Sequence, residues 1–344
     1  MERYNRFRDR GTGIAPFLPA PLLPAPGCCP LPIRALFFLV RLPFLIFAFV
    51  AYFAILQWLP IGSLAKKAAL WCILAVPSIW WVDLQVEGVR KGQLSKQKSR
   101  LPGPGSVIAA SFTSPIDALY LAAVFDPIFT ASYAEIKEVE HISLFEAIIR
   151  AFDLPEYHFE PRKDAKLVTI EELQRKYPNR PIAVFPECTT SNGRGVLPLC
   201  ASLTTFRSSS KIFPISMRYQ PEDVVTPLPG HYIDFLWALL SRPTHCIMVR
   251  IAEPIGALGG RPLVHDKAKT ASMFTNNFDL MDKNLVDAVG EALARMGQVR
   301  RVGLGVYEKE IFLYYWNKMH REEREEREQR ERGQREHGER EHLE

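Results

Sequence analysis

Two stretches decide the fold: SFTSPID at residues 111–117 and FPECTTSNGRG at residues 185–195. Each follows a short apolar run, 106–110 and 181–185, that is typical of a buried strand. Ligands of open α/β sheets bind beyond the carboxyl ends of the strands, where loops rich in hydroxyls and glycine bring backbone donors close to an anion. The two stretches therefore predict a binding site at one edge of a sheet.

Around these stretches, β-like runs alternate with helical ones from Pro102 to Pro254, and this alternation predicts an α/β domain. The apolar runs predict strands at 106–110, 127–132, 183–185, 211–217 and 246–251. Apolar periodicity and the charges at the segment ends predict helices at 117–125, 168–176, 278–296 and 307–319.

The two stretches resemble motifs one and three of the glycerolipid acyltransferases, which move an acyl chain from acyl-CoA to glycerol phosphate or a lysophospholipid. The family's first motif is Asn-His, four residues and Asp; here Asp117 fills the acidic position, while Ser111 and Phe112 replace Asn and His. The third motif is Phe-Pro-Glu-Gly-Thr, and here Cys188 replaces the Gly. In addition, FEPR at 159–162 resembles motif two and FPI at 213–215 resembles motif four, so the motif order matches.

The amino end, residues 1–19, is similar to the start of the fungal lysophosphatidic acid:oleoyl-CoA acyltransferases, a branch linked to vacuolar protein sorting. This resemblance implies a glycerol-phosphate-acyltransferase-like mixed sheet flanked by helices. It implies acyl-CoA and a lysophospholipid as substrates, phosphatidic acid as product, and no cofactor or metal. The implied site residues are Asp117 and His158 as catalytic groups and, for substrate binding, Thr113, Ser114, Arg162, Glu187, Thr189, Ser191 and Arg194.

Phe112 removes the imidazole that serves as catalytic base in the family, and a carboxylate with an ordinary pKa of about 4 is a weak base for an alcohol. His158 or His141 could supply the base, or Asp117 could act with a water molecule. The remaining alternative is an inactive acyltransferase fold that serves as a lipid-binding or trafficking protein.

A long apolar region precedes the α/β domain. Residues 42–59 approach the roughly 20 residues that a membrane-crossing helix needs, and 68–82 form a second, shorter apolar stretch. Basic residues flank both outer ends, which favours a cytosolic location for each. The sequence therefore predicts a hydrophobic helical hairpin, either crossing the membrane twice or lying in one leaflet; a buried pair of soluble helices is the alternative.

The net charge of +5 does not indicate nucleic-acid binding, because the basic residues are not interleaved with aromatics. The six cysteines show no Cys-x-x-Cys pair, so neither a zinc site nor a disulfide framework is indicated. A catalytic domain facing the cytosol, at the endoplasmic reticulum membrane or a lipid droplet, is the expected location.

Five segments are expected along the chain. They are a Pro-rich extended segment (1–33), the membrane-anchoring hairpin with its linker (34–100), the acyltransferase domain (101–255), a helical extension (256–319) and a charged Arg/Glu tail (320–344).

Overall fold

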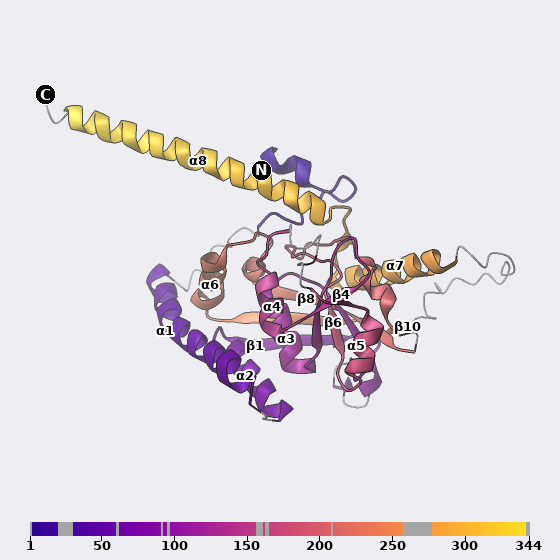
Figure 1. Ribbon diagram of the computed structural model, residues 1–344. Helices are drawn as coiled ribbons and strands as arrows, with labels where there is room; N and C mark the ends of the chain where they lie inside the picture. Colours follow the sequence, from indigo (N-terminus) through magenta and orange to yellow (C-terminus); the bar gives the residue numbers. More distant parts are fainter. Residues whose placement is uncertain are drawn as a thin grey trace.

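The computed structural model describes residues 2–19, 30–59, 62–90, 92–94, 97–155, 161, 165–207, 209–256 and 277–341. Its centre is a nine-stranded mixed sheet with helices on both faces (Figure 1). The strand order is β1 (Ile79–Val86), β9 (His245–Ile251), β8 (Lys211–Gln220), β2 (Val107–Ala110), β6 (Ile182–Val184), β3 (Ile128–Ala131), β4 (Val139–Ile142) and β5 (Leu167–Val168), with β10 (Ile255–Gly256) paired to β8. The predicted α/β fold with a mixed sheet is confirmed.

The register places the two motif loops together. β8, β2 and β6 are parallel neighbours, with Ile108 opposite Phe213 on one side and Ala183 on the other. Because the carboxyl ends of parallel strands meet at the same edge, the loops that follow β2 and β6 begin side by side.

Side chains of these central strands alternate between two buried clusters, as a strand buried on both faces requires. Ile108 and Ala110 of β2 point to one face and Val107 and Ala109 to the other. The first face is covered by α1 (Leu31–Val50), α2 (Ser63–Ala75), α3 (Pro115–Phe125), α4 (Leu144–Arg150) and α6 (Tyr232–Ser241). The second face is covered by α5 (Ile170–Lys176), the short helix η6 (Ala201–Thr205) and α7 (Asn277–Gly297).

The second arm of the predicted hairpin is not confirmed. Within the described residues, one helical segment, Leu31–Leu56, is long and apolar enough to cross a membrane; it joins α1 to the π-helical turn η2 (Ala51–Leu56). The second apolar stretch divides instead: α2 ends before Pro77, and Ile79–Val86 pairs with β9 as an edge strand. Proline interrupts the helix, and the aromatic and β-branched residues that follow suit a strand. The sheet thus starts before residue 101.

Helix α1 is fastened to the domain by Arg41. Its guanidinium donates to the carbonyl oxygens of Leu240 at 3.2 Å, Pro243 at 3.2 Å and Arg242, and to Ser78 Oγ at 2.8 Å. These acceptors lie at and just beyond the carboxyl end of α6 and before β1. An apolar helix with exposed Leu36, Phe44 and Phe47 is therefore held along the domain at its midpoint.

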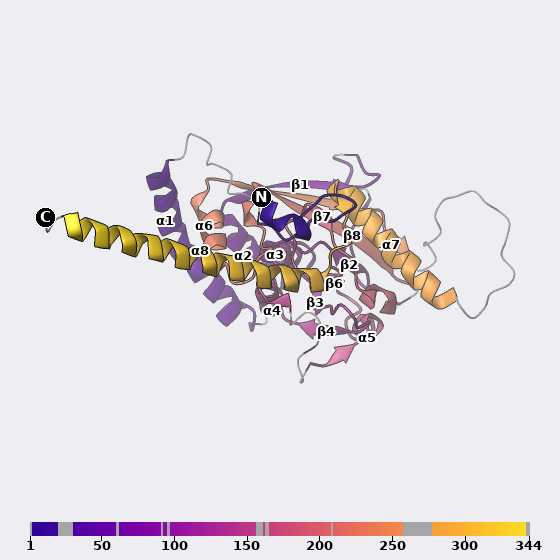
Figure 2. The ribbon, with the colours of Figure 1, turned by 90° about the horizontal axis from the view of Figure 1, so that it is seen from above.

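The amino-terminal segment is packed rather than extended over the surface as expected. Its short helix η1 (Glu2–Phe7) and the residues up to Pro19 lie beside α8 (Val306–Glu341), as both views show (Figures 1 and 2). Phe17 is 1% exposed and its ring centroid lies 6.1 Å from that of Phe312. The prediction missed this because alternating proline and apolar residues give no periodicity that identifies a partner. Beyond residue 320, where the sequence allowed either a solvated helix or a disordered tail, α8 continues as a helix, and its residues 321–330 are mostly exposed.

Candidate active site

The site begins with the loop that follows β2. Asp117 lies in the first turn of α3, which Ser114 caps. The Asp117 Oδ2 atom accepts hydrogen bonds from Thr113 N at 2.7 Å, Ser114 N at 2.9 Å and Thr113 Oγ1 at 3.1 Å. Tyr219 of β8 donates its hydroxyl to Oδ1. The carboxylate therefore holds the Thr113–Ser114 turn in place and ties it to β8.

Asp117 is completely buried, and burial raises its pKa to about 6. The four donors oppose this shift, because hydrogen bonds to a carboxylate favour its charged form. The group is consequently ionised at neutral pH but is a stronger base than an ordinary aspartate. The raised pKa partly compensates for the weakness of an ordinary carboxylate as a base.

The loop after β6 lies against the first. Ser191 N donates to Phe112 O at 3.1 Å, and a Cβ on Gly193 would meet Thr113 Cγ2 at 3.5 Å. Glu187 is 2% exposed and accepts from Leu197 N at 3.3 Å. Burial raises its pKa to about 8, and the charge of Asp117 raises it further, so the two carboxyl groups share one low-dielectric region. The predicted convergence of the two stretches is what the structure shows.

Phe112 occupies the place of the missing imidazole as a core residue. Its ring is 1% exposed and stacks on Phe185, with centroids 4.6 Å apart. Among the described residues, no histidine hydrogen-bonds to Asp117. His141 lies on β4, away from the loops, where its ring stacks on Tyr177 at 5.7 Å. His158 and Arg162 lie outside the described residues.

Lys309 is a buried cation that the sequence did not reveal. It comes from α8, is 0% exposed, and its Nζ donates to Thr189 Oγ1 at 2.9 Å, Thr190 O at 2.7 Å and Thr190 Oγ1 at 2.9 Å. Burial lowers its pKa to about 7. All three ammonium protons are thus directed at motif three, so the carboxyl-terminal helix fixes that loop.

The same loop is also held by the amino-terminal segment. Asn192 Nδ2 donates to Ala15 O at 2.8 Å and to Leu18 O at 2.9 Å, and Asn192 N donates to Pro16 O at 2.8 Å. Both ends of the chain therefore converge on motif three. Neither contact was predictable, because each joins residues more than 100 positions apart.

Arg218 and Glu222 line a small polar hollow next to Thr113 and Tyr219. Arg194 and Arg218 donate to opposite oxygens of Glu222, at 3.2 and 3.3 Å, and both are partly exposed. The hollow has a volume of only about 10 Å³. Arg194 was a predicted binding residue, whereas Arg218 and Tyr219 were not, because β8 carries no polar motif that marks them. No cluster of His, Cys, Asp and Glu suited to a metal ion is found in the described part of the chain.

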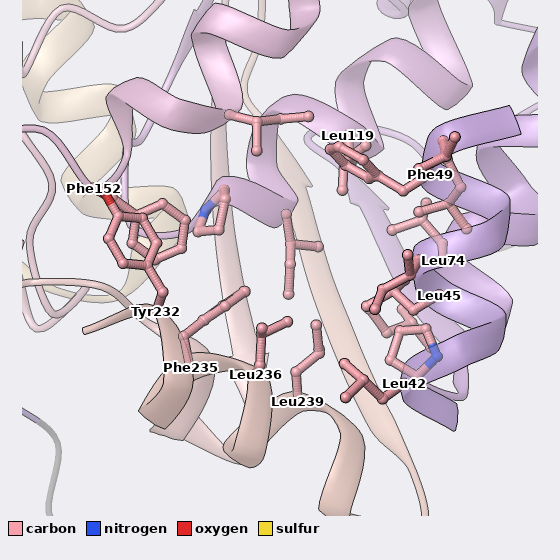
Figure 3. A pocket seen from close by; sticks show the side chains of 18 residues that line it. Leu42, Leu45, Phe49, Leu74, Leu119, Phe152, Tyr232, Phe235, Leu236 and Leu239 are labelled. Carbon is pink, nitrogen blue, oxygen red and sulfur yellow. The ribbon is translucent and has the colours of Figure 1, made fainter. Parts of the chain in front are cut away.

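On the other side of α3, an apolar cavity of about 320 Å³ lies between the amino-terminal helices and α6 (Figure 3). Its walls are formed by α1 with Leu42, Leu45 and Phe49, by α3 with Leu119, and by α6 with Phe235 and Leu239. Pro115 and Ile116, in the same segment as Asp117, complete the lining. The size lies in the range of about 300 to 1,000 Å³ usual for ligand sites.

No family model matches the chain. A Schizosaccharomyces pombe protein, provisionally named lysophosphatidic acid:oleoyl-CoA acyltransferase, is 25% identical over 334 residues, covering 93% of this chain and 100% of its own. Lysophosphatidic acid:oleoyl-CoA acyltransferase 1 of Saccharomyces cerevisiae is 27% identical over 205 residues, covering 58% of this chain and 60% of its own. The crystal structure of the 1-acyl-sn-glycerophosphate acyltransferase PlsC from Thermotoga maritima aligns with a TM-score of 0.32 at 16% identity, covering 77% and 97% of the two chains. The two fungal relatives bear out the resemblance that the motifs predicted: this chain is similar to the lysophosphatidic acid acyltransferases.

Proposed function

We propose that this protein is a membrane-bound 1-acylglycerol-3-phosphate O-acyltransferase that transfers a long acyl chain from acyl-CoA to lysophosphatidic acid. One observation carries the proposal. The segment 111–117 contributes Thr113 and Asp117 to the polar loops, and Pro115 and Ile116 to the wall of the apolar cavity. A polar reaction centre and a lipid-sized cavity therefore share one turn of chain, as an enzyme that joins an acyl chain to a phosphorylated alcohol requires.

The arginine pair would bind the phosphate. Arg194 and Arg218 already converge on the two oxygens of Glu222, a geometry that an incoming phosphate can take over, because a guanidinium binds oxygens in pairs and stays charged. Arg162 remains a predicted contributor from outside the described residues.

The reaction would use both carboxyl groups in different protonation states. The acceptor hydroxyl attacks the thioester carbonyl and gives its proton to the Asp117 carboxylate. As the carbonyl re-forms, the C–S bond breaks and the CoA sulfur takes that proton from Asp117 and leaves as the thiol. Glu187, with a pKa of about 8, is largely protonated at neutral pH and can donate a hydrogen bond to an anionic oxygen. Both groups are buried, so the acceptor hydroxyl displaces Thr113 or Tyr219 from Asp117 after the loops open.

The exposed apolar side chains of α1 and the edge tryptophans Trp80 and Trp81, 67% and 70% exposed, would face lipid. With α1 tied to the domain at Arg41, insertion into one leaflet fits better than a double crossing. The endoplasmic reticulum membrane or a lipid droplet surface, with the site towards the cytosol, is the proposed location. The reaction as written needs no cofactor beyond acyl-CoA as substrate.

A second candidate is a lipid-binding or trafficking protein without turnover. The hydrogen bonds of Asp117 favour this candidate. Each carboxylate oxygen already has a protein donor, and the side chain caps the helix in which it lies. Such an arrangement is also what a purely structural capping box provides.

The test is transfer of radiolabelled oleate from oleoyl-CoA to lysophosphatidate by the purified protein in phospholipid vesicles. We expect Asp117→Asn to lower the rate by about 10²- to 10⁴-fold, because that is the usual contribution of general-base catalysis. Asp126→Asn, at the other end of α3 in a left-handed conformation that Asn tolerates, is the matched control and should keep its activity. Turnover that survives Asp117→Asn would contradict the mechanism, and oleoyl-CoA binding without turnover in the wild type would favour the second candidate.

A further inference from the structure

Two buried thiols bracket the motif-three loop. The side chains of Cys188 and Cys200 belong to one buried cluster. Cys188 Sγ lies 3.7 Å from Pro186 O, and Cys200 N donates to the same oxygen at 2.8 Å. Val306 at the start of α8 belongs to the same cluster. Two residues 12 positions apart are therefore already in side-chain contact.

The chain between them contains Thr189, Thr190 and Asn192, which bond Lys309 and the amino-terminal segment. In the same stretch, Ser191 N donates to Phe112 O. A covalent link between the cysteines would close a ring around this loop.

We propose that Cys188 and Cys200 are a redox-sensitive pair that a hydroperoxide converts to a disulfide, and that the disulfide stops acyl transfer until a thiol reductant reopens it. The Cys200 thiolate attacks the outer oxygen of the hydroperoxide, the O–O bond breaks, and the sulfur becomes a sulfenic acid while an alcohol, or water from hydrogen peroxide, leaves. The Cys188 sulfur then attacks the sulfenic sulfur, forming the S–S bond and releasing water. In total, two thiols lose two electrons and two protons to one peroxide.

The surroundings give the two sulfurs different roles. The contact with Cys188 and the hydrogen bond with Ser202 Oγ, at 3.0 Å, lower the pKa of Cys200, which favours its thiolate. The same thiol–thiol contact, with burial, raises the pKa of Cys188 well above its usual value. Cys200 is therefore the attacking residue and Cys188 the resolving one.

A surface hollow lies next to the pair. Leu199 and Ala201, on either side of Cys200, line a hollow of about 300 Å³ together with Lys137 and Lys283. Cys200 is 6% and Cys188 4% exposed, so a small oxidant reaches the pair after a local opening far smaller than substrate entry needs.

Oxidation changes the loop because Cys188 stands between two site residues. Forming the bond draws the sulfurs to about 2.05 Å. Cys188 has a left-handed backbone, φ 60°, so it has little freedom to absorb the shift, and its neighbours Glu187 and Thr189 move with it. The contacts of Glu187 with Leu197 N and of Thr189 with Lys309 are then altered, and the ring resists the opening that exposes Asp117.

Disulfide formation itself is independent of the proposed function; only its effect on transfer rests on that function. The experiment therefore measures both. In a variant whose other cysteines (28, 29, 72 and 246) are serine, hydrogen peroxide should produce one cross-linked peptide pair joining Cys188 to Cys200, seen by mass spectrometry without reduction. Oleoyl transfer should fall at least about tenfold in parallel, and dithiothreitol should restore it.

Cys200→Ser should transfer oleate at the wild-type rate and lose the peroxide response, with Cys200→Ala as a second variant should the serine fold poorly. Cys246→Ser in the wild-type background is the matched control and should keep the response. A pair that becomes sulfinic without cross-linking would overturn the proposal, as would a disulfide that leaves transfer unchanged. A cross-link in a protein that never transfers oleate would refute the proposed function while leaving the thiol chemistry established.

Discussion

The two sides of α3 differ in how their space is filled. On the motif side, Asp117, Glu187 and most of the loop 188–200 are buried, with Arg194 and Pro198 exposed, and the adjoining hollow beside Thr113 and Tyr219 measures only about 10 Å³. On the α1 side, the apolar cavity of about 320 Å³ is already open. Polar groups must be satisfied when they are buried, whereas an apolar wall costs little to leave uncovered. Under the proposed function, an acyl chain would enter a cavity that is already open, while the headgroup site would have to open.

The largest effect is expected when the motif-three loop loses the contacts that hold it in place. Lys309→Met removes three hydrogen bonds to Thr189 and Thr190, each worth about 0.5 to 1.5 kcal/mol where the amine is neutral and about 1.5 to 3 kcal/mol where it is charged. We expect oleoyl transfer to fall by about 100-fold, because motif three loses its fixed geometry, while binding of a fluorescent acyl-CoA analogue stays within a factor of two. Lys318→Met, on the exposed part of the same helix, is the control. A loss of acyl-CoA binding equal to the loss of rate would show that the two sides are not separate.

The second prediction concerns the free energy of unfolding and how it changes with pH. The pKa of Lys309 is about 7 in the folded protein against 10.5 in a model compound, so between these values the unfolded chain binds a proton that the folded one lacks. The free energy of unfolding of the wild type, relative to Lys309→Met, should therefore rise with pH from about 7 to 10.5, by up to about 1.4 kcal/mol per pH unit. Urea unfolding of both proteins at pH 7, 8 and 9 measures this. A constant difference would mean that the three threonine contacts keep the ammonium charged.

The smallest expected effect lies on the apolar side. Leu45→Trp on α1 places a larger ring in the cavity, and each methylene of acyl chain that loses its place costs about 0.8 kcal/mol, or about fourfold. The ratio of kcat/KM for oleoyl-CoA to that for octanoyl-CoA should fall by about that factor. Phe44→Trp, at the neighbouring exposed position, should leave the ratio unchanged. An equal loss for both substrates would mean that the cavity does not hold the acyl chain.

The sequence predicted the centre of the fold well because local signals coincide there. Apolar runs bounded by turns mark β2, β6, β8 and β9 to within a few residues, and Pro115 and Asp117 mark the start of α3. The two-residue strands β5 and β7 (Gly195–Val196) carry too little pattern to be recognised, and α6 was missed as well. β1 was hidden because Trp80 and Trp81 continue the apolar stretch of α2.

Only the site residues that lie within a continuous stretch of sequence could be predicted. Thr113, Ser114, Asp117, Glu187, Thr189, Ser191 and Arg194 come from two continuous stretches, and the structure brings them to one edge. Tyr219 and Lys309 stand among other polar residues, Tyr219 between Arg218 and Gln220 and Lys309 between Glu308 and Glu310, so nothing in the local sequence distinguishes them from surface residues. Only tertiary packing reveals that they complete the same cluster.

The attachment of Arg41 has a mechanical consequence. Because the midpoint of α1 is bonded to the end of α6, the apolar helix cannot tilt without turning the whole body. On a lipid surface, the depth of that helix would then set the height of the reaction centre above the headgroups. The thickness and packing of the bilayer would then determine how far a lysolipid has to move out of the membrane to reach the reaction centre.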